Sequence, residues 1–261
     1  MLFRSGHAVG VQGGHNIVIE DNYMEYCQNA ICLHAWIEQE MKDIIIRNNF
    51  IHDSGDRAMP ISGHHGSPYG MRTGIEMYNN IIANAEAQAI TTNGVDPVFI
   101  RDNTVYDAYG FTCWTRDYGP HWVGSNNLMY QTPQRYLSLS NGHDTPDWSV
   151  DWDYNLYYPE TISGFAGSEF FIRDLGYMSF AEWRAAGYDM HGLSADPLFV
   201  NGSGAYDEPE DFQLQWNSPA IDAGDDALEY PRDFGGNPIY GRRDIGAWEY
   251  QPPYAMGADA V

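Results

Sequence analysis

Histidine, arginine, tyrosine and aspartate gather in short, often glycine-containing segments between the apolar stretches of this chain. Histidine and tyrosine can remove or return a proton, and a guanidinium can neutralise a substrate carboxylate. The candidate catalytic residues are His34, Arg57, His64, His65, Asp117 and Tyr118. This inventory suits β-elimination on a polymer of uronic acids, in which a base removes the proton at C5, next to the carboxylate.

A second set of side chains offers hydrogen bonds, positive charge and flat rings to a sugar chain. Hydroxyl and amide groups bind sugar hydroxyls, and an aromatic ring gives a stacking platform. The candidate substrate-binding residues are Ser62, Tyr69, Arg72, Asn93, Trp114, Arg116, His121 and Arg135. The plainer interpretation is an ordinary solvated surface, on which Asp56 and Arg57 form an ion pair of small energetic value.

A short segment recurs six times and organises these residues. Its register is an apolar residue, two variable residues, Asn, a variable residue and an apolar residue, replaced by Tyr157 in the last copy. The repeated asparagines are Asn22, Asn49, Asn80, Asn103, Asn126 and Asn155. Their spacings are 27, 31, 23, 23 and 29 residues. A constant Asn at a variable spacing indicates stacked units joined by loops of different length.

A short strand with period-two alternation precedes each copy of the segment. Alternation predicts that its apolar residues, such as Ile31 and Leu33, point inward. The outward side chains then form one column across the units: Gln12, His34, Ser62, Asn93, Trp114 and Ser140. A neighbouring outward column contains Gly10, Cys32, Pro60, Thr91, Thr112 and Ser138.

These features together predict a β-solenoid. A unit of about 23 residues cannot bury its own apolar side chains, whereas stacked coils pair like strands about 4.8 Å apart around one core. An Asn at the same corner of every coil can stack amide on amide and bond backbone groups left unpaired by the bend. The alternative is a β-sandwich with accidental Asn spacing.

On these motifs the chain resembles the right-handed parallel β-helix proteins of the pectate-lyase-like superfamily. The C-terminal third resembles the closing segment of secreted bacterial β-helix proteins, many of them carbohydrate-active. The segments concerned are 179–189 (SFAEWRAAGYD), 196–200 (DPLFV), 211–214 (DFQL), 218–224 (SPAIDAG) and 244–250 (DIGAWEY). The resemblance implies an all-β, single-stranded right-handed parallel β-helix of about six coils, with an Asn ladder and a helix-containing C-terminal cap. We expect coils over residues 1–158 and a coil and cap region over 159–261.

In that superfamily the strand before the variable loop usually lines the substrate groove, which places His34 and Trp114 on the groove face. A lysine-dependent lyase mechanism is not expected, because Lys42, the sole lysine, lies away from this face. Hydrolysis is an alternative that needs two carboxylates about 5–9.5 Å apart. Asp56 and Asp117 are the candidates, two coils from each other. Residues 117–121 (DYGPH) also resemble the Tyr-Gly-Phe-Asp-Pro-His signature of mannuronan C5-epimerases, without two of its internal residues.

The C-terminal third carries a helix signal and several acidic residues. Ser179 and Glu182 form a capping box ahead of a short helix with Phe180 and Trp183 on its apolar side, and Gly187 would stop it. Calcium is the one cofactor considered, with the acidic ligands Asp222, Asp225, Asp226, Asp233 and Asp244. Their spacing fits no EF-hand, so a solvated cap is the preferred interpretation and no metal ligand is assigned.

Composition limits the partners. The formal net charge is −23, from 36 acidic and 13 basic residues, which argues against nucleic acid and anionic lipid. The three cysteines do not make a disulfide framework, and no apolar run approaches a membrane span. We expect a polysaccharide or oligosaccharide partner and a secreted or cell-surface location, although the first residues lack a signal-peptide apolar region. Non-catalytic alternatives are an adhesin, a carbohydrate-binding module and a tail fibre.

The open end of the first coil needs a cap or a neighbouring strand to cover it. Ala8-Val9-Gly10-Val11-Gln12 already aligns with the later strands, and no amphipathic helix precedes it. An uncovered coil exposes apolar core and unpaired backbone groups. We therefore expect either a missing N-terminal part or self-association at this end.

Overall fold

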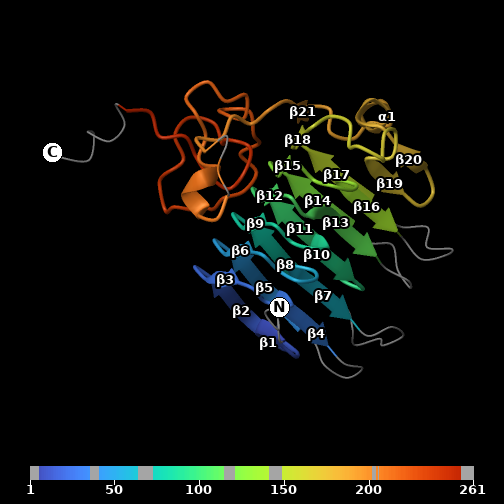
Figure 1. The fold of residues 1–261 in the computed structure, drawn as a ribbon. Helices are drawn as coiled ribbons and strands as arrows, with labels where there is room; N and C mark the ends of the chain where they lie inside the picture. Colours follow the sequence, from blue (N-terminus) through green and yellow to red (C-terminus); the bar gives the residue numbers. More distant parts are fainter. Residues whose placement is uncertain are drawn as a thin grey trace.

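The computed structural model describes residues 6–35, 41–63, 73–114, 121–140, 149–201, 204 and 206–253. Over these residues the chain winds as a right-handed parallel β-helix whose strands stack into three sheets (Figure 1). The predicted fold class is confirmed. The sheets hold eight, six and seven strands. The number of coils therefore differs slightly from the expected number of about six.

The three sheets are named A, B and C in the order in which each coil passes through them. Sheet A holds β1 (His7–Val11), β4 (Asn29–Ala35), β7 (Met59–Gly63), β10 (Gln88–Asn93), β13 (Tyr109–Trp114), β16 (Leu137–Ser140), β19 (Phe170–Ile172) and β20 (Gly176–Met178). Sheet B holds β2 (Gly14–Glu20), β5 (Met41–Arg47), β8 (Thr73–Tyr78), β11 (Val98–Arg101), β14 (His121–Ser125) and β17 (Ser149–Asp153). Sheet C holds β3 (Tyr23–Glu25), β6 (Phe50–His52), β9 (Ile81–Ala83), β12 (Thr104–Tyr106), β15 (Leu128–Tyr130), β18 (Leu156–Tyr158) and β21 (Leu193–Ser194). Neighbouring strands pair in parallel, except β19 and β20, which pair antiparallel.

The apolar core fills the space between the sheets. The sheet A side chains predicted to point inward are buried from the second coil onward: Ile31, Leu33, Met59, Ile61, Ile90, Thr92, Phe111, Cys113, Leu137 and Leu139. Val9 and Val11 of the first coil are only partly buried. Among the described strands β1 pairs with β4 alone, so its inward side chains have a packed neighbour on one side.

An asparagine ladder runs along the corner between sheets B and C, as predicted. At each step the Nδ2 of one asparagine donates to the Oδ1 of the next, at 2.9–3.0 Å. The backbone N–H of each asparagine donates to the same oxygen, at 2.8–3.3 Å. The members are Asn22, Asn49, Asn80, Asn103, Asn127 and Asn155.

One predicted member of the ladder is wrong. β11 and β14 pair Ile100 with Gly124, so Asn127 and not Asn126 reaches the ladder position. The inward position of this copy is Gly124 rather than an apolar residue, because the ring of Trp152 in the next coil fills the space. A Cβ at Gly124 would lie 2.2 Å from that ring. The repeat register in the sequence therefore takes the neighbouring Val123 as the apolar residue and is off by one. Asn126 instead takes the left-handed corner position at φ 57°, a conformation that Asn and Asp tolerate.

The ladder ends on a carboxylate. The Oδ1 of Asp189 accepts hydrogen bonds from the N and Nδ2 of Asn155, both at 3.0 Å. Its Oδ2 accepts from the Tyr157 hydroxyl at 2.5 Å and from Trp183 Nε1 at 3.2 Å. A carboxylate offers acceptors alone, so it satisfies the donors that remain at the end of a run of amides.

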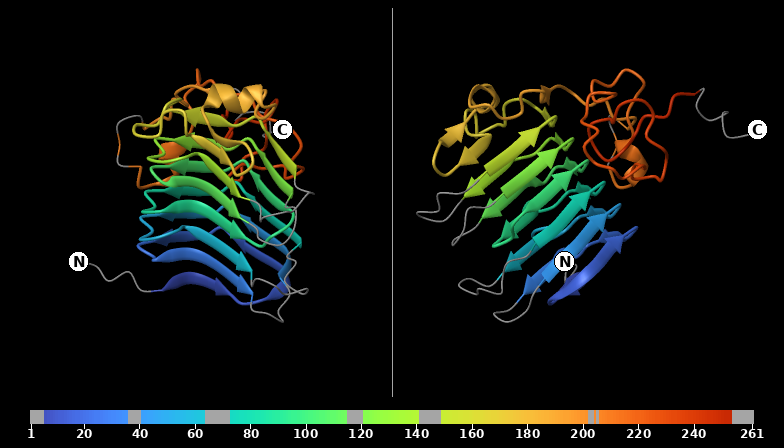
Figure 2. Two further views of the ribbon diagram at one scale, coloured as in Figure 1. Left: turned by 90° about the vertical axis from the view of Figure 1, so that its right-hand side faces the viewer. Right: turned by 180° about the vertical axis from the view of Figure 1, so that it is seen from behind.

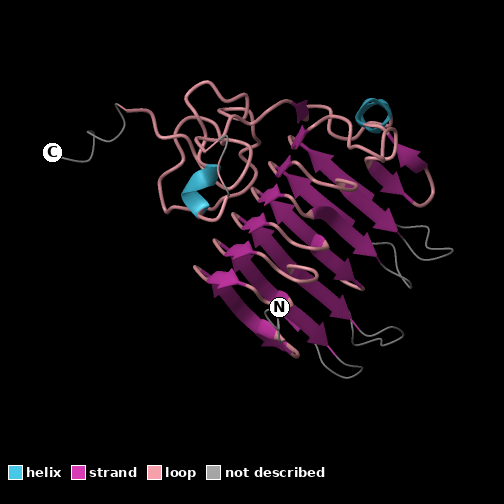
Figure 3. Ribbon diagram, viewed as in Figure 1, coloured by secondary structure: helices cyan, strands magenta, loops and turns pink. Residues whose placement is uncertain are grey.

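The predicted helix is present as α1 (Phe180–Ala185), with its capping box formed. Its Trp183 side chain is fully buried and stacks on Phe170 of the last coil, with ring centroids 4.9 Å apart. Gly187 follows the helix in the left-handed region at φ 97°. The helix therefore closes this end of the core, beside the last strands of sheet A (Figure 3).

The rest of the C-terminal region lies on the outer face of sheet C (Figure 2). Its apolar side chains form a second core with outward residues of that sheet. The interpretation of the acidic residues as a solvated cap is wrong for Asp233 and Asp244, each 3% exposed. Their carboxylates accept backbone N–H groups instead, because this irregular segment lacks strand partners for them. No helix within the described residues is long and apolar enough to span a bilayer.

Candidate functional site

The outer face of sheet A carries a column of small side chains, which we call the strip. Its members are partly or fully exposed and stand in register from coil to coil, as alternation predicts. The strip consists of Gly10, Cys32, Pro60, Thr91, Thr112 and Ser138. Small side chains leave room for a ligand to approach the backbone of the sheet.

A polar column, which we call the histidine row, follows one side of the strip. The strand register pairs His34 with Ser62, Ser62 with Asn93, and Asn93 with Trp114. Three coil steps of about 4.8 Å therefore separate His34 from Trp114. Four of the candidate site residues are thus brought together, and all four are half-buried.

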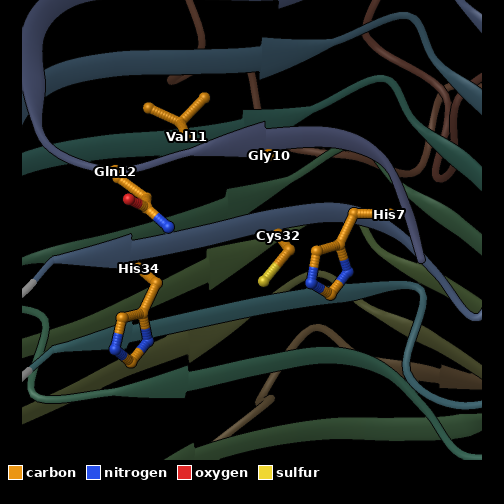
Figure 4. Close-up of a pocket in the computed structure, with 6 residues that line it drawn as sticks. All are labelled: His7, Gly10, Val11, Gln12, Cys32 and His34. Carbon is orange, nitrogen blue, oxygen red and sulfur yellow. The ribbon is translucent and has the colours of Figure 1, made fainter.

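His34 lies at the edge of a pocket at the first-coil end of the strip. Its Nδ1 is 2.7 Å from the Ser62 hydroxyl oxygen, a hydrogen bond that orients the imidazole ring and influences which nitrogen carries the proton. The pocket has a volume of about 420 Å³, and His7 and Cys32 also line it (Figure 4). Burial raises the pKa of the Cys32 thiol, so this cysteine is neutral and is not an activated nucleophile.

A second polar column, the arginine row, stands at the start of the same strands. It consists of Arg57, Gln88, Tyr109 and Arg135. The Nε of Arg57 donates to Gln88 Oε1 at 3.3 Å. The Arg135 guanidinium stacks on Phe165 and Tyr177, 5.1 and 4.6 Å from the ring centroids. Within the described part of the chain neither arginine has a carboxylate partner.

His121 is placed elsewhere. It begins β14 in sheet B and pairs with Ser149 of β17. Its backbone N and its Nδ1 lie 2.6 and 3.0 Å from Asp96 Oδ1. This candidate therefore belongs to a local contact at the start of sheet B rather than to either row of sheet A.

Seven candidate residues lie outside the described residues: His64, His65, Tyr69, Arg72, Arg116, Asp117 and Tyr118. All belong to the segments that connect sheet A to sheet B, after β7 and after β13. Of the two carboxylates considered for hydrolysis, Asp56 is described and half-buried, while Asp117 is not described.

Four of the five residues considered for calcium accept hydrogen bonds through their carboxylates, and Asp225 is the exception within the described part of the chain. Asp222 Oδ1 accepts from Arg242 N at 2.9 Å, and Asp226 Oδ1 accepts from Arg243 N at 3.0 Å. Where the chain is described, no group of three or more His, Cys, Asp or Glu side chains is arranged to hold a metal ion.

Sequence reasoning did not identify His7 as part of the pocket. His7 pairs with Asn29, at the register position that Arg57 holds in the third coil, so the repeat pattern could have placed it in line with the arginine row. Tyr177 was missed because β20 runs antiparallel and follows no repeat.

Residues 3–128 match the family model described as the right handed beta helix region. The matched segment spans the coils from β1 to the start of β15 and includes His34, Ser62, Asn93 and Trp114. The description concerns the fold and names no activity. No curated protein matches the chain significantly.

Proposed function

We propose that this protein is an extracellular polysaccharide lyase of the pectate-lyase-like superfamily, which binds a uronic-acid polymer along the strip and cleaves it by β-elimination. The observation that carries the proposal is the strip itself, a run of small side chains between the histidine row and the arginine row. The three columns give a long, partly exposed face of hydrogen-bonding, aromatic and cationic groups.

The repeat distance of the face suits a linear polymer. Strands of sheet A stack about 4.8 Å apart, close to the length of one sugar unit in an extended chain. Each coil therefore offers a similar set of polar groups to successive units. The side chain of Trp114 adds an aromatic surface, and an indole ring packs well against the apolar face of a sugar ring.

Local cations favour an acidic polymer, although the chain as a whole is acidic. A chain with net charge −23 repels polyanions at long range, so binding one requires local cations. Arg57 and Arg135 supply them, since no carboxylate among the described residues neutralises either guanidinium. A guanidinium fork matches the two oxygens of a carboxylate.

The chemistry assigned to these groups is proton abstraction followed by loss of a sugar leaving group. A base removes the C5 proton of a uronic acid unit, the C4–C5 double bond forms, and the C4–O bond breaks. The leaving oxygen then takes up a proton. His34, oriented by Ser62, is the described residue proposed as base, and Arg57 would stabilise the charge that develops on the carboxylate. His64, His65 and Tyr118 remain candidates for the returning acid.

A substrate panel tests this function. The protein is incubated with alginate, pectins, ulvan and glycosaminoglycans while the ultraviolet absorbance of unsaturated ends is followed. We expect unsaturated product from at least one polymer and a loss of at least about 100-fold in rate for His34→Ala. His191→Ala is the matched control, because His191 contacts Asp153 at the end of sheet B.

Other outcomes would assign another function. Reducing ends without unsaturation indicate a hydrolase, and a changed uronate composition without cleavage indicates an epimerase. Binding without any reaction indicates an adhesin or a carbohydrate-binding module. Any of these results, or full activity in His34→Ala, contradicts the lyase assignment to His34.

A further inference from the structure

The strip changes character at its last coils. From Gly10 to Ser138 its side chains are small, but the strand register then pairs Ser138 with Phe171 of β19 and Phe171 with Tyr177 of β20. The same outward column therefore ends in two aromatic rings. A column of small side chains over six coils is thus followed by two aromatic residues near α1.

The two rings form one platform with an exposed face. Their centroids lie 4.8 Å apart at an interplanar angle of 39°, and Tyr177 is 57% exposed. An exposed ring at an outward strand position offers an apolar surface on which a sugar ring can stack. The hairpin of β19 and β20 anchors the platform to the core, because Phe170 and Met178 on its other face are buried there.

A guanidinium stands beside this platform in a fixed orientation. Arg135 lies against both Phe165 and Tyr177, with its Cζ 5.1 and 4.6 Å from the two centroids. Packing against aromatic rings holds the plane of a guanidinium while its N–H groups remain directed sideways. No described carboxylate pairs with it, although the chain has 36 acidic residues.

We propose that Phe171, Tyr177 and Arg135 form an end subsite for one uronic acid unit, whose ring stacks on Tyr177 and whose carboxylate binds Arg135. This inference rests on the proposed function, which assigns the strip to a uronic-acid polymer. The end subsite adds a length requirement. Six strand steps of about 4.8 Å separate the coil of His34 from Tyr177, so only oligosaccharides of about six units or more contact both.

A length series of uronic acid oligosaccharides tests the end subsite. Affinities are measured by titration from the disaccharide to the octasaccharide, in a His34→Ala background that keeps the ligands intact. The affinity is expected to rise with length and to show a further gain when the ligand spans the strip. Tyr177→Ala should abolish this last gain, about tenfold in dissociation constant, and leave short ligands unaffected.

Two further variants separate stacking from charge. Tyr177→Phe should bind like the parent, because the ring remains. Arg135→Gln should weaken long uronate ligands and leave a neutral oligosaccharide of equal length unchanged. Tyr240→Ala and Arg232→Gln are matched controls, since Tyr240 is 56% exposed and Arg232 bonds Gly236 O within the C-terminal region.

The outcomes distinguish the two proposals. If the parent binds uronate oligosaccharides and Tyr177→Ala has the same length dependence, the end subsite is wrong and the proposed function stands. If the parent binds no uronate oligosaccharide of any length, both proposals are wrong. A tenfold loss that is equal for short and long ligands also contradicts the end subsite, because it indicates a change in the whole face.

Discussion

The outer faces of sheets A and C come from the same coils but have opposite characters. The outward side of sheet C carries large apolar residues such as Phe50, Leu128 and Tyr130, and the C-terminal region buries them in a second core. The outward side of sheet A carries the strip, whose residues are small and partly or fully exposed. A single winding therefore produces one face that the chain covers itself and one face that it leaves accessible.

The difference suggests that the two outer faces of the solenoid have different roles. Apolar rows on an outer face require cover, and Phe212 and Trp248 supply it on sheet C. Rows of small and polar side chains need no cover, because water or sugar hydroxyls satisfy them. The second core on sheet C contributes stability, and we propose that sheet A provides the ligand surface, so substitutions on the two faces should have different consequences.

The largest expected effect on stability is in the covered face. Phe212 is 1% exposed, and its ring lies 5.2–5.4 Å from those of Tyr206 and Phe199. Phe212→Ala leaves a cavity there, and we expect a loss of about 3–5 kcal/mol in the free energy of unfolding, measured by urea denaturation. Trp216→Ala is the control in the same region, because Trp216 is 76% exposed.

This substitution also tests the division between the faces. Below its melting temperature Phe212→Ala should bind polysaccharide as the parent does. Loss of binding by a folded Phe212→Ala protein would show that sheet C or its cover takes part in the ligand site.

A smaller effect is expected from pH, again on the covered face. Burial, followed by repulsion from Asp244, raises the pKa of Glu249 to about 8, and burial raises that of Asp244 to about 7. A raised pKa in the folded state means that folding favours the protonated form. The stability from these two groups is therefore fully present below their unfolded pKa of about 4 and is lost as pH rises towards 8.

Thermal melts between about pH 5 and about pH 9 measure this dependence. We expect the melting temperature to fall with rising pH, and to fall less in Glu249→Gln, because that variant has one titrating group fewer. Glu229→Gln is the control, since Glu229 is exposed. A slope that is the same in all three proteins would contradict the assignment to Glu249.

The smallest effect on stability is expected in the strip. Thr112 points outward from β13 and is half-buried. Thr112→Trp should change the free energy of unfolding by no more than about 0.5 kcal/mol, while its bulk interrupts the path of a bound polymer. Urea denaturation and polysaccharide titration on the same sample would compare both properties. Unchanged binding in this variant would place the polymer elsewhere.

The sequence alone predicted the histidine row and the strip of sheet A, but not the arginine row. Strand alternation together with the repeated asparagine placed His34, Ser62, Asn93 and Trp114 in one row, because each coil repeats the same geometry. The prediction was wrong by one residue at Asn126. There Gly124 has no side chain, and the ring of Trp152 from the next coil fills the inward space. A single repeat pattern cannot detect such a compensation between neighbouring coils.

The regions without repeats could not be predicted in the same way. The C-terminal region has no period, so its position on sheet C depends on long-range contacts such as that between Tyr106 and Tyr206. The aromatic platform at Tyr177 depends on an antiparallel strand that ends the parallel order. In both places tertiary packing decides the structure, and local sequence carries little of that information.

The most direct test of the account is a comparison of two tryptophans. The dissociation constant for a uronic-acid polymer is measured for the parent, Trp114→Ala and Trp216→Ala. Trp114 stands in the histidine row of sheet A, and Trp216 is an exposed ring in the C-terminal region. We expect about tenfold weaker binding for Trp114→Ala and no change for Trp216→Ala. Equal affinities in all three proteins, or a loss confined to Trp216→Ala, would contradict the claim that the outer face of sheet A is the ligand surface.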